Sequence, residues 1–240
     1  MSEYEKSVIL YDDGIGRVDY ISHMGSDLTV VNSARVSFGV EKLHLDNRDR
    51  KLINYLIKHR HTSTLEHCVI TYKFTVPLFV RSQHHRHRTW SYNEISRRYT
   101  DKDLQFYVPK EFRTQHKSNR QASNPDELVD PVILHDWSDY GEGVRASEYL
   151  KTQTERCLES YKDLIRGGVC REQARMVLPQ NLYTEYYGTT NLNNLLKFID
   201  LRTHEGAQWE IQKTAEACLE IATDLFPITV GSYREIRGGI

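Results

Sequence analysis

A strict alternation of side chains does most to limit the fold. Apolar residues stand at every second position from Ile70 to Leu78, and Thr or Lys separates the first four of them. A repeat of two residues turns alternate side chains to opposite faces of a pleated strand, so residues 70–78 are predicted to form a half-buried strand. Pro77 can then open a helix over residues 78–87, because its fixed φ suits a first helical turn.

Other segments have the spacing of helices or of a hairpin. Apolar residues recur at helical spacing in residues 48–59, which predicts an amphipathic helix. Residues 7–31 alternate around a turn-forming Asp-Asp-Gly-Ile-Gly sequence and are predicted to be strands joined by a turn. Strands that precede helices without repeated strand–helix–strand units indicate an α+β fold, with a mixed or antiparallel sheet core flanked by helices. Further helices are predicted at residues 148–166, 191–201 and 207–225, the last ending before Pro227.

The bulk composition fits one domain. With 240 residues, 39% of them hydrophobic, the chain can bury a substantial core, and residues 1–240 are interpreted as a single domain. Residues 113–147 are polar and contain two prolines and two glycines, which is typical of a mobile loop or an insertion. No linker or repeat divides the sequence.

Charge and cysteine content narrow the class of protein. The 32 basic and 33 acidic side chains give a net charge of −1, which argues against a dedicated nucleic-acid coat. The four cysteines form no Cys-x-x-Cys pair, and reduced thiols are the simplest interpretation. The acidic, polar N-terminus does not resemble a signal peptide, and no segment is long and apolar enough to cross a bilayer. We therefore expect a cytoplasmic protein with neither a membrane nor a nucleic-acid partner.

Between Arg86 and Tyr99 the chain reads Arg-His-Arg-Thr-Trp-Ser-Tyr-Asn-Glu-Ile-Ser-Arg-Arg-Tyr. Guanidinium groups match phosphate oxygens with two parallel hydrogen bonds, and Ser and Asn add short neutral donors. The single carboxylate, Glu94, can accept from a sugar hydroxyl or a ring N–H. This composition predicts a site for a phosphorylated, hydroxyl-bearing ligand such as a nucleotide.

The same segment resembles the signature of flavin-dependent thymidylate synthases, Arg-His-Arg-x-x-Ser-x-Asn-Glu-x-Ser-x-Arg-Tyr, at every fixed position. The resemblance extends from about Asp27 to Trp209. It implies a helix-flanked sheet and a homotetramer whose active sites lie between subunits. It also implies a methyltransferase that converts dUMP to dTMP, with methylenetetrahydrofolate as carbon donor, FAD as hydride carrier and NADPH as the reductant of the flavin.

The resemblance also implies roles for particular residues. Arg202 would be catalytic, stabilising negative charge on the uracil ring. The dUMP ligands would be Gln83, Arg86, Glu94, Ser96, Arg97, Arg98, Arg175 and Arg202. The FAD ligands would be Ser37, His61, Ser63, Glu66, Arg86, His87, Arg88, Glu94, Asn191, Asn193 and Lys197. Taken alone, Arg202 would be a side chain extending from a helix end, and Arg175 a surface ion pair.

Three positions depart from the usual family pattern. Arg97 stands where a small residue is common, Lys197 where Asn or His is usual, and Gly206 where some relatives have His. Lys197 therefore puts a cation where the family's adenine-side flavin contact is neutral, while Arg97 either adds a phosphate contact or reshapes the loop.

Ser96 is interpreted as a dUMP ligand and not as a nucleophile. A serine nucleophile needs an adjacent base, for which His87 is the nearby candidate, and flavin chemistry makes such a nucleophile unnecessary. The histidines between His59 and His87 have spacings that a metal site could use, but the arginines among them would repel a cation, so no metal is predicted.

Two other functions compete with this interpretation. A flavin-free thymidylate synthase needs a cysteine nucleophile after a proline, and none of the four cysteines follows one. A non-catalytic nucleotide- or RNA-binding module could instead use Trp90, Tyr92 and Tyr99 as stacking platforms. The visible spectrum distinguishes these proteins, because a flavoprotein is yellow and a simple RNA-binding protein is colourless.

Overall fold

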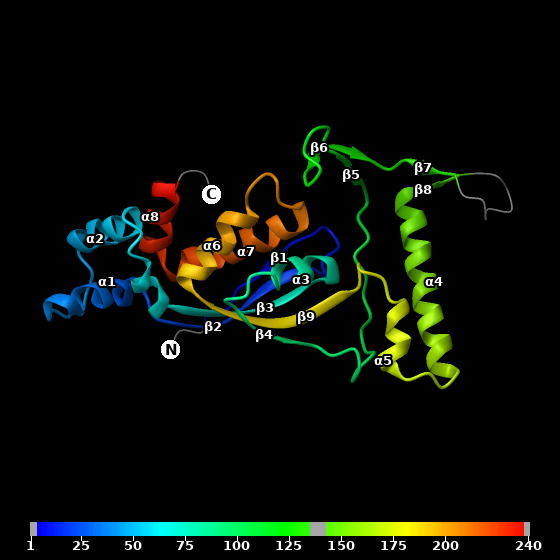
Figure 1. Cartoon of the computed structure of the whole chain (residues 1–240), viewed down its shortest axis with the longest axis horizontal. Helices are drawn as coiled ribbons and strands as arrows, with labels where there is room; N and C mark the ends of the chain where they lie inside the picture. The colour runs from blue at the N-terminus through cyan, green and yellow to red at the C-terminus, as the bar shows by residue number, and fades with distance from the viewer. Residues whose placement is uncertain (1–3, 135–142, 238–240) are drawn as a thin grey trace.

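An antiparallel sheet lies at the centre of the computed structural model, which describes residues 4–134 and 143–237 (Figure 1). Its strands follow the spatial order β1-β2-β3-β9-β4, and every neighbouring pair is antiparallel. The strand bounds are β1 Ser7–Ile9, β2 Arg17–Met24, β3 Val69–Pro77, β4 Ser91–Glu94 and β9 Tyr183–Asn191. The predicted α+β class is confirmed.

The alternating segment forms β3, the middle strand of the sheet. Its four inward side chains from Ile70 to Val76 are completely buried, as the alternation predicts. Thr75 and Pro77 on the other face are buried too, so the C-terminal half of β3 is covered on both faces. The strand is therefore more deeply enclosed than the half-buried prediction.

Helices flank the sheet, and four of the predicted ones are confirmed. Residues 48–59, 148–166, 191–201 and 207–225 correspond to α2, α4, α6 and α7 within about two residues. The helix α7 packs on the sheet, where Tyr72 Oη donates to the carbonyl oxygen of Cys218 at 3.3 Å. The helix bounds are α1 Asp27–Arg35, α2 Asn47–Lys58, α3 Leu78–His84, α4 Ala146–Arg166, α5 Arg171–Ala174, α6 Leu192–Arg202, α7 Trp209–Leu225 and α8 Pro227–Arg237, with short 3₁₀ turns η1 Val36–Phe38, η2 Thr62–His67 and η3 Arg175–Val177.

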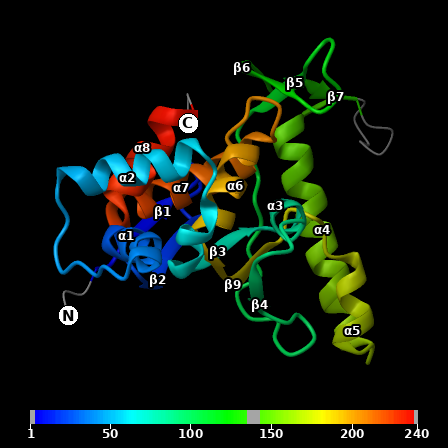
Figure 2. The same ribbon diagram turned by 60° about the vertical axis from the view of Figure 1, so that its left-hand side comes forward.

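The molecule is elongated, and its two ends differ. The helices α1 and α2 lie at one end, whereas α4 and α5 lie apart from the other helices at the opposite end (Figures 1 and 2). Most buried apolar side chains form one contiguous core that joins the sheet to α6, α7 and α8, whereas Tyr161 of α4 and Ala174 of α5 are buried outside it. Among the described residues, no helix is long and apolar enough to span a membrane.

Several element predictions were wrong. Residues 27–31 belong to α1 and not to a strand, because Ser26 begins that helix and exchanges capping hydrogen bonds with Thr29. The predicted helix over residues 78–87 ends at His84, where Tyr92 Oη donates to the carbonyls of His84 and His87 at 3.0 and 3.1 Å. No strand was predicted after Arg88, yet residues 91–94 pair with β9 as an edge strand.

The polar segment 113–147 contains regular structure in its described part. Strands β5 Phe112–Gln115 and β6 Ser123–Val129 form one hairpin, and β7 Val132–Ile133 pairs with β8 Val144–Arg145. Residues 135–142 lie outside the described part. The described part is therefore not irregular loop, because backbone pairing between polar strands leaves little signal in the sequence, and the interpretation of the segment as an insertion stays a prediction.

Candidate active site

The Arg-rich segment has an inner face that anchors it. Trp90 is 6% exposed, stacks on Tyr92 with parallel rings 6.2 Å apart, and contacts Phe198 of α6 at 5.5 Å between ring centroids. Tyr92 in turn bonds the carbonyls at the end of α3. These contacts fix the turn from Arg86 to Arg88 between α3 and β4. They also remove Trp90 as a stacking platform for RNA, because its ring is not accessible.

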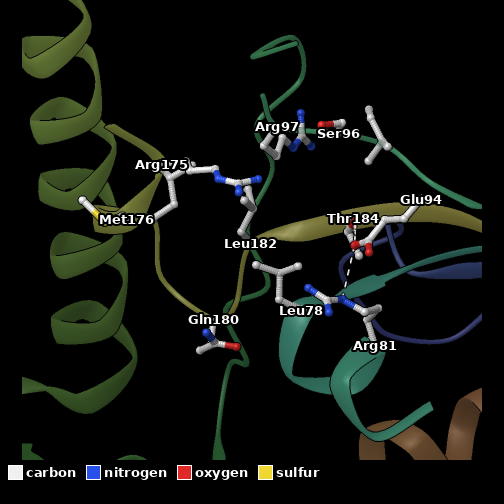
Figure 3. A pocket seen from close by; sticks show the side chains of 12 residues that line it. Leu78, Arg81, Glu94, Ser96, Arg97, Arg175, Met176, Gln180, Leu182 and Thr184 are labelled. Atoms are coloured by element: carbon white, nitrogen blue, oxygen red, sulfur yellow. Dashed lines mark hydrogen bonds and ion pairs between the residues drawn. The ribbon is translucent and has the colours of Figure 1, made fainter. Parts of the chain in front are cut away.

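A cleft of about 580 Å³ opens beside β4, between α3 and the turn η3 (Figure 3). Four of the predicted dUMP ligands line it: Glu94, Ser96, Arg97 and Arg175. Glu94 pairs with Arg81 Nε at 3.2 Å and accepts a hydrogen bond from Thr184 Oγ1 at 2.7 Å, as the close-up shows. Glu94 is thereby fixed at the wall of a cleft whose cations come from separate elements.

The arginines around this cleft are not equivalent. Arg97 donates to the carbonyls of Lys102 at 2.8 Å and Tyr183 at 3.3 Å, so its guanidinium braces the loop, and burial lowers its pKa. Arg98 is exposed and pairs with Glu172 at 3.0 Å. Arg175 is exposed and lines the cleft, with no ion pair among the described residues. It is thus the cleft cation best placed to meet an incoming phosphate.

A second group forms where α3 approaches the end of α6. Arg202 Nε donates to His87 Nε2 at 3.0 Å, and Arg202 Nη2 donates to the carbonyl oxygen of Gln83 at 3.2 Å. Burial, and secondarily Arg202, lowers the pKa of His87 to about 4, so His87 is neutral and accepts at Nε2. Burial, and then Arg86, lowers the pKa of Arg202. Within the described ranges no carboxylate pairs with Arg202, so its charge is available to an anion.

A third group surrounds the start of α6 and contains predicted flavin ligands. Asn193 Nδ2 donates to Glu66 of η2 at 2.9 Å, and Asn191 Oδ1 accepts from the Asn194 amide at 2.9 Å as the helix cap. Thr190 Oγ1 donates to the carbonyl of Thr89 at 3.5 Å, which brings the residue after Arg88 to this helix start.

The donor set of this third group fits FAD. The start of α6 contributes positive potential that favours a diphosphate, while the Leu192 and Asn194 N–H groups already donate to the Cys68 carbonyl and to Asn191 Oδ1. Arg88 directly precedes Thr89, whose carbonyl accepts from Thr190 beside this helix start. His61 and Ser63 are exposed at the neighbouring turn η2 and can bind hydroxyl groups. Lys197 is also exposed on α6, two turns or less from that helix start.

Ser37 lies apart from these groups on one chain. It belongs to η1, directly after α1, and its Oγ donates to the carbonyl of Ala34 at 3.0 Å. Arg175 directly follows α5, at the opposite end of the molecule from α1 (Figure 1). The predicted site residues are therefore brought together in groups and not in a single pocket.

Some residues of the site were missed at the sequence level. Arg81 and Thr184 line the cleft with Glu94, and Gln208 bonds the amide of Gln83. In the sequence, Arg81 could have been noticed as the single cation after the apolar residues Leu-Phe-Val, whereas no local pattern points to Thr184 or Gln208. Among the described residues, no group of three His, Cys, Asp or Glu side chains could hold a metal ion.

Comparison of sequences relates this chain to thymidylate synthases. Residues 19–228 match the family model described as thymidylate synthase complementing protein. The flavin-dependent thymidylate synthase of Thermus thermophilus is 40% identical over 92% of this chain and 76% of the relative. That of Kosmotoga olearia is 38% identical over 91% of this chain and 90% of the relative.

Comparison of structures leads to the same group of proteins. A UMP/dUMP methylase, PolB from Streptomyces cacaoi, bound with 5-Br dUMP, has a TM-score of 0.73 and 31% identity. The match covers 91% of this chain and 94% of that structure. The fold of this chain is thus shared with a methylase that was solved with a pyrimidine nucleotide analogue bound.

Proposed function

This chain belongs to the thymidylate synthase complementing protein family, and we propose that it acts as a flavin-dependent thymidylate synthase, a methyltransferase that converts dUMP to dTMP. The observation that carries this proposal is Arg202, a half-buried cation held by His87 and Gln83 without a neutralising carboxylate among the described residues. A methyl transfer to uracil C5 needs negative charge to be stabilised on the ring, and a desolvated guanidinium does this strongly.

The cleft beside β4 is proposed to bind the nucleotide. Arg175 would bind the phosphate with Ser96 as a short hydroxyl ligand, and Glu94 would accept from the sugar or base. Gln83, Arg86 and Arg98 complete the proposed dUMP set, while Arg97 contributes by holding the loop in shape. Binding energy from these groups orients uracil relative to Arg202.

The residues around the start of α6 are proposed to hold FAD. Glu66 and Asn193 are already fixed by their mutual hydrogen bond, so they lose little conformational entropy on binding. Neutral His87 keeps Arg202 in place without cancelling its charge. Once reduced by NADPH, bound FAD would supply the hydride that completes the methyl group, and we propose methylenetetrahydrofolate as the carbon donor.

The assembly is proposed to be a homotetramer with shared active sites. Ser37 and Arg175 lie at opposite ends of one chain, so one chain alone does not supply both to the same site. Val36 and Phe38, which flank Ser37, are 72% and 84% exposed, and Leu43 further along the chain is 80% exposed, which suits a surface covered by another subunit. The unpaired cysteines agree with the reducing, cytoplasmic setting that we propose.

The experiment is to incubate the purified protein with excess FAD, remove free flavin and record the visible spectrum. We expect a yellow protein that forms dTMP from dUMP and methylenetetrahydrofolate, with NADPH oxidised only when dUMP is present. Omission of the folate is the control, because it removes the carbon donor and leaves flavin binding intact. A protein that stays colourless with excess FAD and forms no dTMP contradicts the proposal.

A further inference from the structure

A chain of hydrogen bonds leads from the hairpin β5–β6 to Arg202. Arg113 of β5 pairs with Glu210 at 2.5 Å between Nη2 and Oε1. Glu210, in the first turn of α7, is 4% exposed, and Tyr107 Oη also donates to its Oε1 at 3.4 Å. Its other oxygen, Oε2, accepts from Gln208 Nε2 at 2.9 Å. Glu210 is therefore a buried carboxylate surrounded by donors.

The carboxylate of Glu210 determines the orientation of the Gln208 side-chain amide, and Gln208 then determines that of Gln83. A carboxylate only accepts hydrogen bonds, so Gln208 must present its NH₂ group to Glu210 and its oxygen to the other side. That oxygen accepts from Gln83 Nε2 at 2.5 Å. The NH₂ group of Gln83 is thus used by Gln208, and Gln83 Oε1 has no hydrogen-bond partner among the described residues. The chemistry of Glu210, and not the assignment of either amide, fixes this order.

The same residues are held close to the proposed catalytic group. Arg202 Nη2 donates to the backbone carbonyl of Gln83, so Gln83 supports Arg202 and is itself supported by Gln208. The loop between α6 and α7 is closed by Gln212 Nε2, which donates to the carbonyls of His204 at 3.1 Å and Ala207 at 2.9 Å. Gln208 is therefore placed firmly at the start of α7.

We propose that Gln208, fixed by Glu210, is a positioning residue. It orients the side-chain amide of Gln83 so that Gln83 Oε1 accepts a hydrogen bond from the nucleotide. This inference rests on the proposed function and goes beyond it, because neither Gln208 nor Glu210 is among the ligands that the signature implies. An acceptor at Gln83 Oε1 suits a donor on dUMP, and the uracil N3–H and the 3′-hydroxyl of the deoxyribose are the groups that qualify. A freely turning amide would present its NH₂ group as readily and bind neither donor as well.

The test is the affinity for dUMP of the FAD-loaded protein carrying Gln208→Met, which keeps the length of the side chain and removes its hydrogen bonds. We expect the Kd for dUMP to rise roughly five- to tenfold, the worth of about one hydrogen bond, with the Kd for FAD unchanged. Gln208→Asn is the second variant, for use if Gln208→Met does not fold. Its amide is too short to reach both Gln83 and Glu210, so we expect the same rise in the Kd for dUMP. A Kd for dUMP within twofold of wild type in the folded variant overturns the proposal.

A double-mutant cycle with Gln83→Met separates positioning from a general structural effect. If Gln208 acts through Gln83, the double variant binds dUMP no more weakly than Gln83→Met alone. If the two effects add, Gln208 acts by another route and the proposal is wrong. A wild-type protein that forms no dTMP overturns both this inference and the proposed function, whereas normal synthesis with additive variants overturns the inference alone.

Two analogues identify the donor on the nucleotide. The analogue without the 3′-hydroxyl and the analogue methylated at N3 each remove one candidate. Gln208→Met should no longer weaken the binding of whichever analogue lacks the relevant donor. If the variant weakens both analogues as much as it weakens dUMP, Gln83 accepts from neither group and the proposal is overturned.

Discussion

Arg202 combines burial with an uncompensated charge, and this combination predicts the effect of its removal. For Arg202→Ala we expect dTMP formation to fall on the order of 10²- to 10³-fold, as when a single charge-stabilising donor is lost. FAD binding should persist, because the proposed flavin residues Glu66 and Asn193 bond each other and not Arg202. Product formation under saturating dUMP, with the flavin spectrum as a folding check, measures this. Arg202→Lys is the matched control, because it keeps the positive charge and loses the planar guanidinium group. Near-normal dTMP synthesis by Arg202→Ala would contradict the catalytic role of Arg202.

The neutral state of His87 predicts how stability depends on pH. Its pKa is lowered from 6.5 to about 4 by burial and then by Arg202. Between these values the unfolded chain binds more protons, so the free energy of unfolding should increase as the pH rises from about 4 to 6.5. Burial lowers the pKa of His84 as well, so His87→Gln should reduce this slope without abolishing it. Urea unfolding at a series of pH values tests this, and an unchanged slope in His87→Gln would be evidence against it.

Ser96 is expected to bind the nucleotide and not to attack it. Its Oγ accepts from the Arg98 amide at 3.3 Å, and the nearby base candidate His87 is occupied at Nε2 by Arg202. Ser96→Ala should weaken dUMP binding by about 1–2 kcal/mol while leaving turnover at saturating dUMP. Titration with dUMP followed by assay at full occupancy measures both quantities. Complete loss of turnover at full occupancy would indicate a nucleophile instead.

At the scale of elements, the middle of the sheet depends on one glycine in β9. A Cβ at Gly188 would lie 2.8 Å from the ring of Phe74 and 3.3 Å from that of Trp90. Gly188→Ala should therefore lower the free energy of unfolding by about 1–3 kcal/mol and disturb the anchor of the signature segment. Gly231→Ala in α8 is the control, since a Cβ there meets nothing and should stabilise the helix by roughly 0.5–1 kcal/mol. Equal effects of the two substitutions on urea unfolding would rule out this packing argument.

Elements with a clear hydrophobic period were predictable from the sequence. The strand β3 and the helices α6 and α7 bury one regular face, so their patterns determine their type. The strand β9 has tyrosines on both faces and is recognisable only beside its partner β3. Pro227 was interpreted as the stop of α7, although it also opens α8.

In the candidate site, too, features set by neighbouring residues in the sequence were predictable, and contacts between distant segments were not. The signature pointed to Glu94 and Ser96, which line the cleft, because their spacing is local. The partners of Gln83 lie far away in sequence, 119 residues for Arg202 and 125 for Gln208. Such contacts depend on how α3 packs against the start of α7, which no local pattern encodes. Sequence motifs therefore name a set of ligands, which stays a prediction, but not the contacts that hold these side chains in place.

At the scale of the whole molecule, the separation of the site residues implies which subunits share a site. Arg86 lies near enough to Arg202 in one chain to lower the pKa of Arg202, so these two arginines are expected to enter a site together. Arg175 instead follows α5 at the far end of the molecule and lines the cleft without Arg202 (Figure 1). The pair that can complement each other is therefore Arg175 and Arg202.

Mixing subunits that carry Arg175→Ala with subunits that carry Arg202→Ala should restore part of the activity. Each variant alone should be nearly inactive, because every site then lacks one of the two cations. In a mixed tetramer some sites receive Arg175 from one chain and Arg202 from another, and these sites are intact. The measurement is dTMP formation after joint refolding, with light scattering to establish the tetramer. The control is a mixture of Arg86→Ala with Arg202→Ala, which should remain inactive. A stable monomer that binds FAD tightly and turns over dUMP would refute the shared-site assembly, since one chain would then be sufficient.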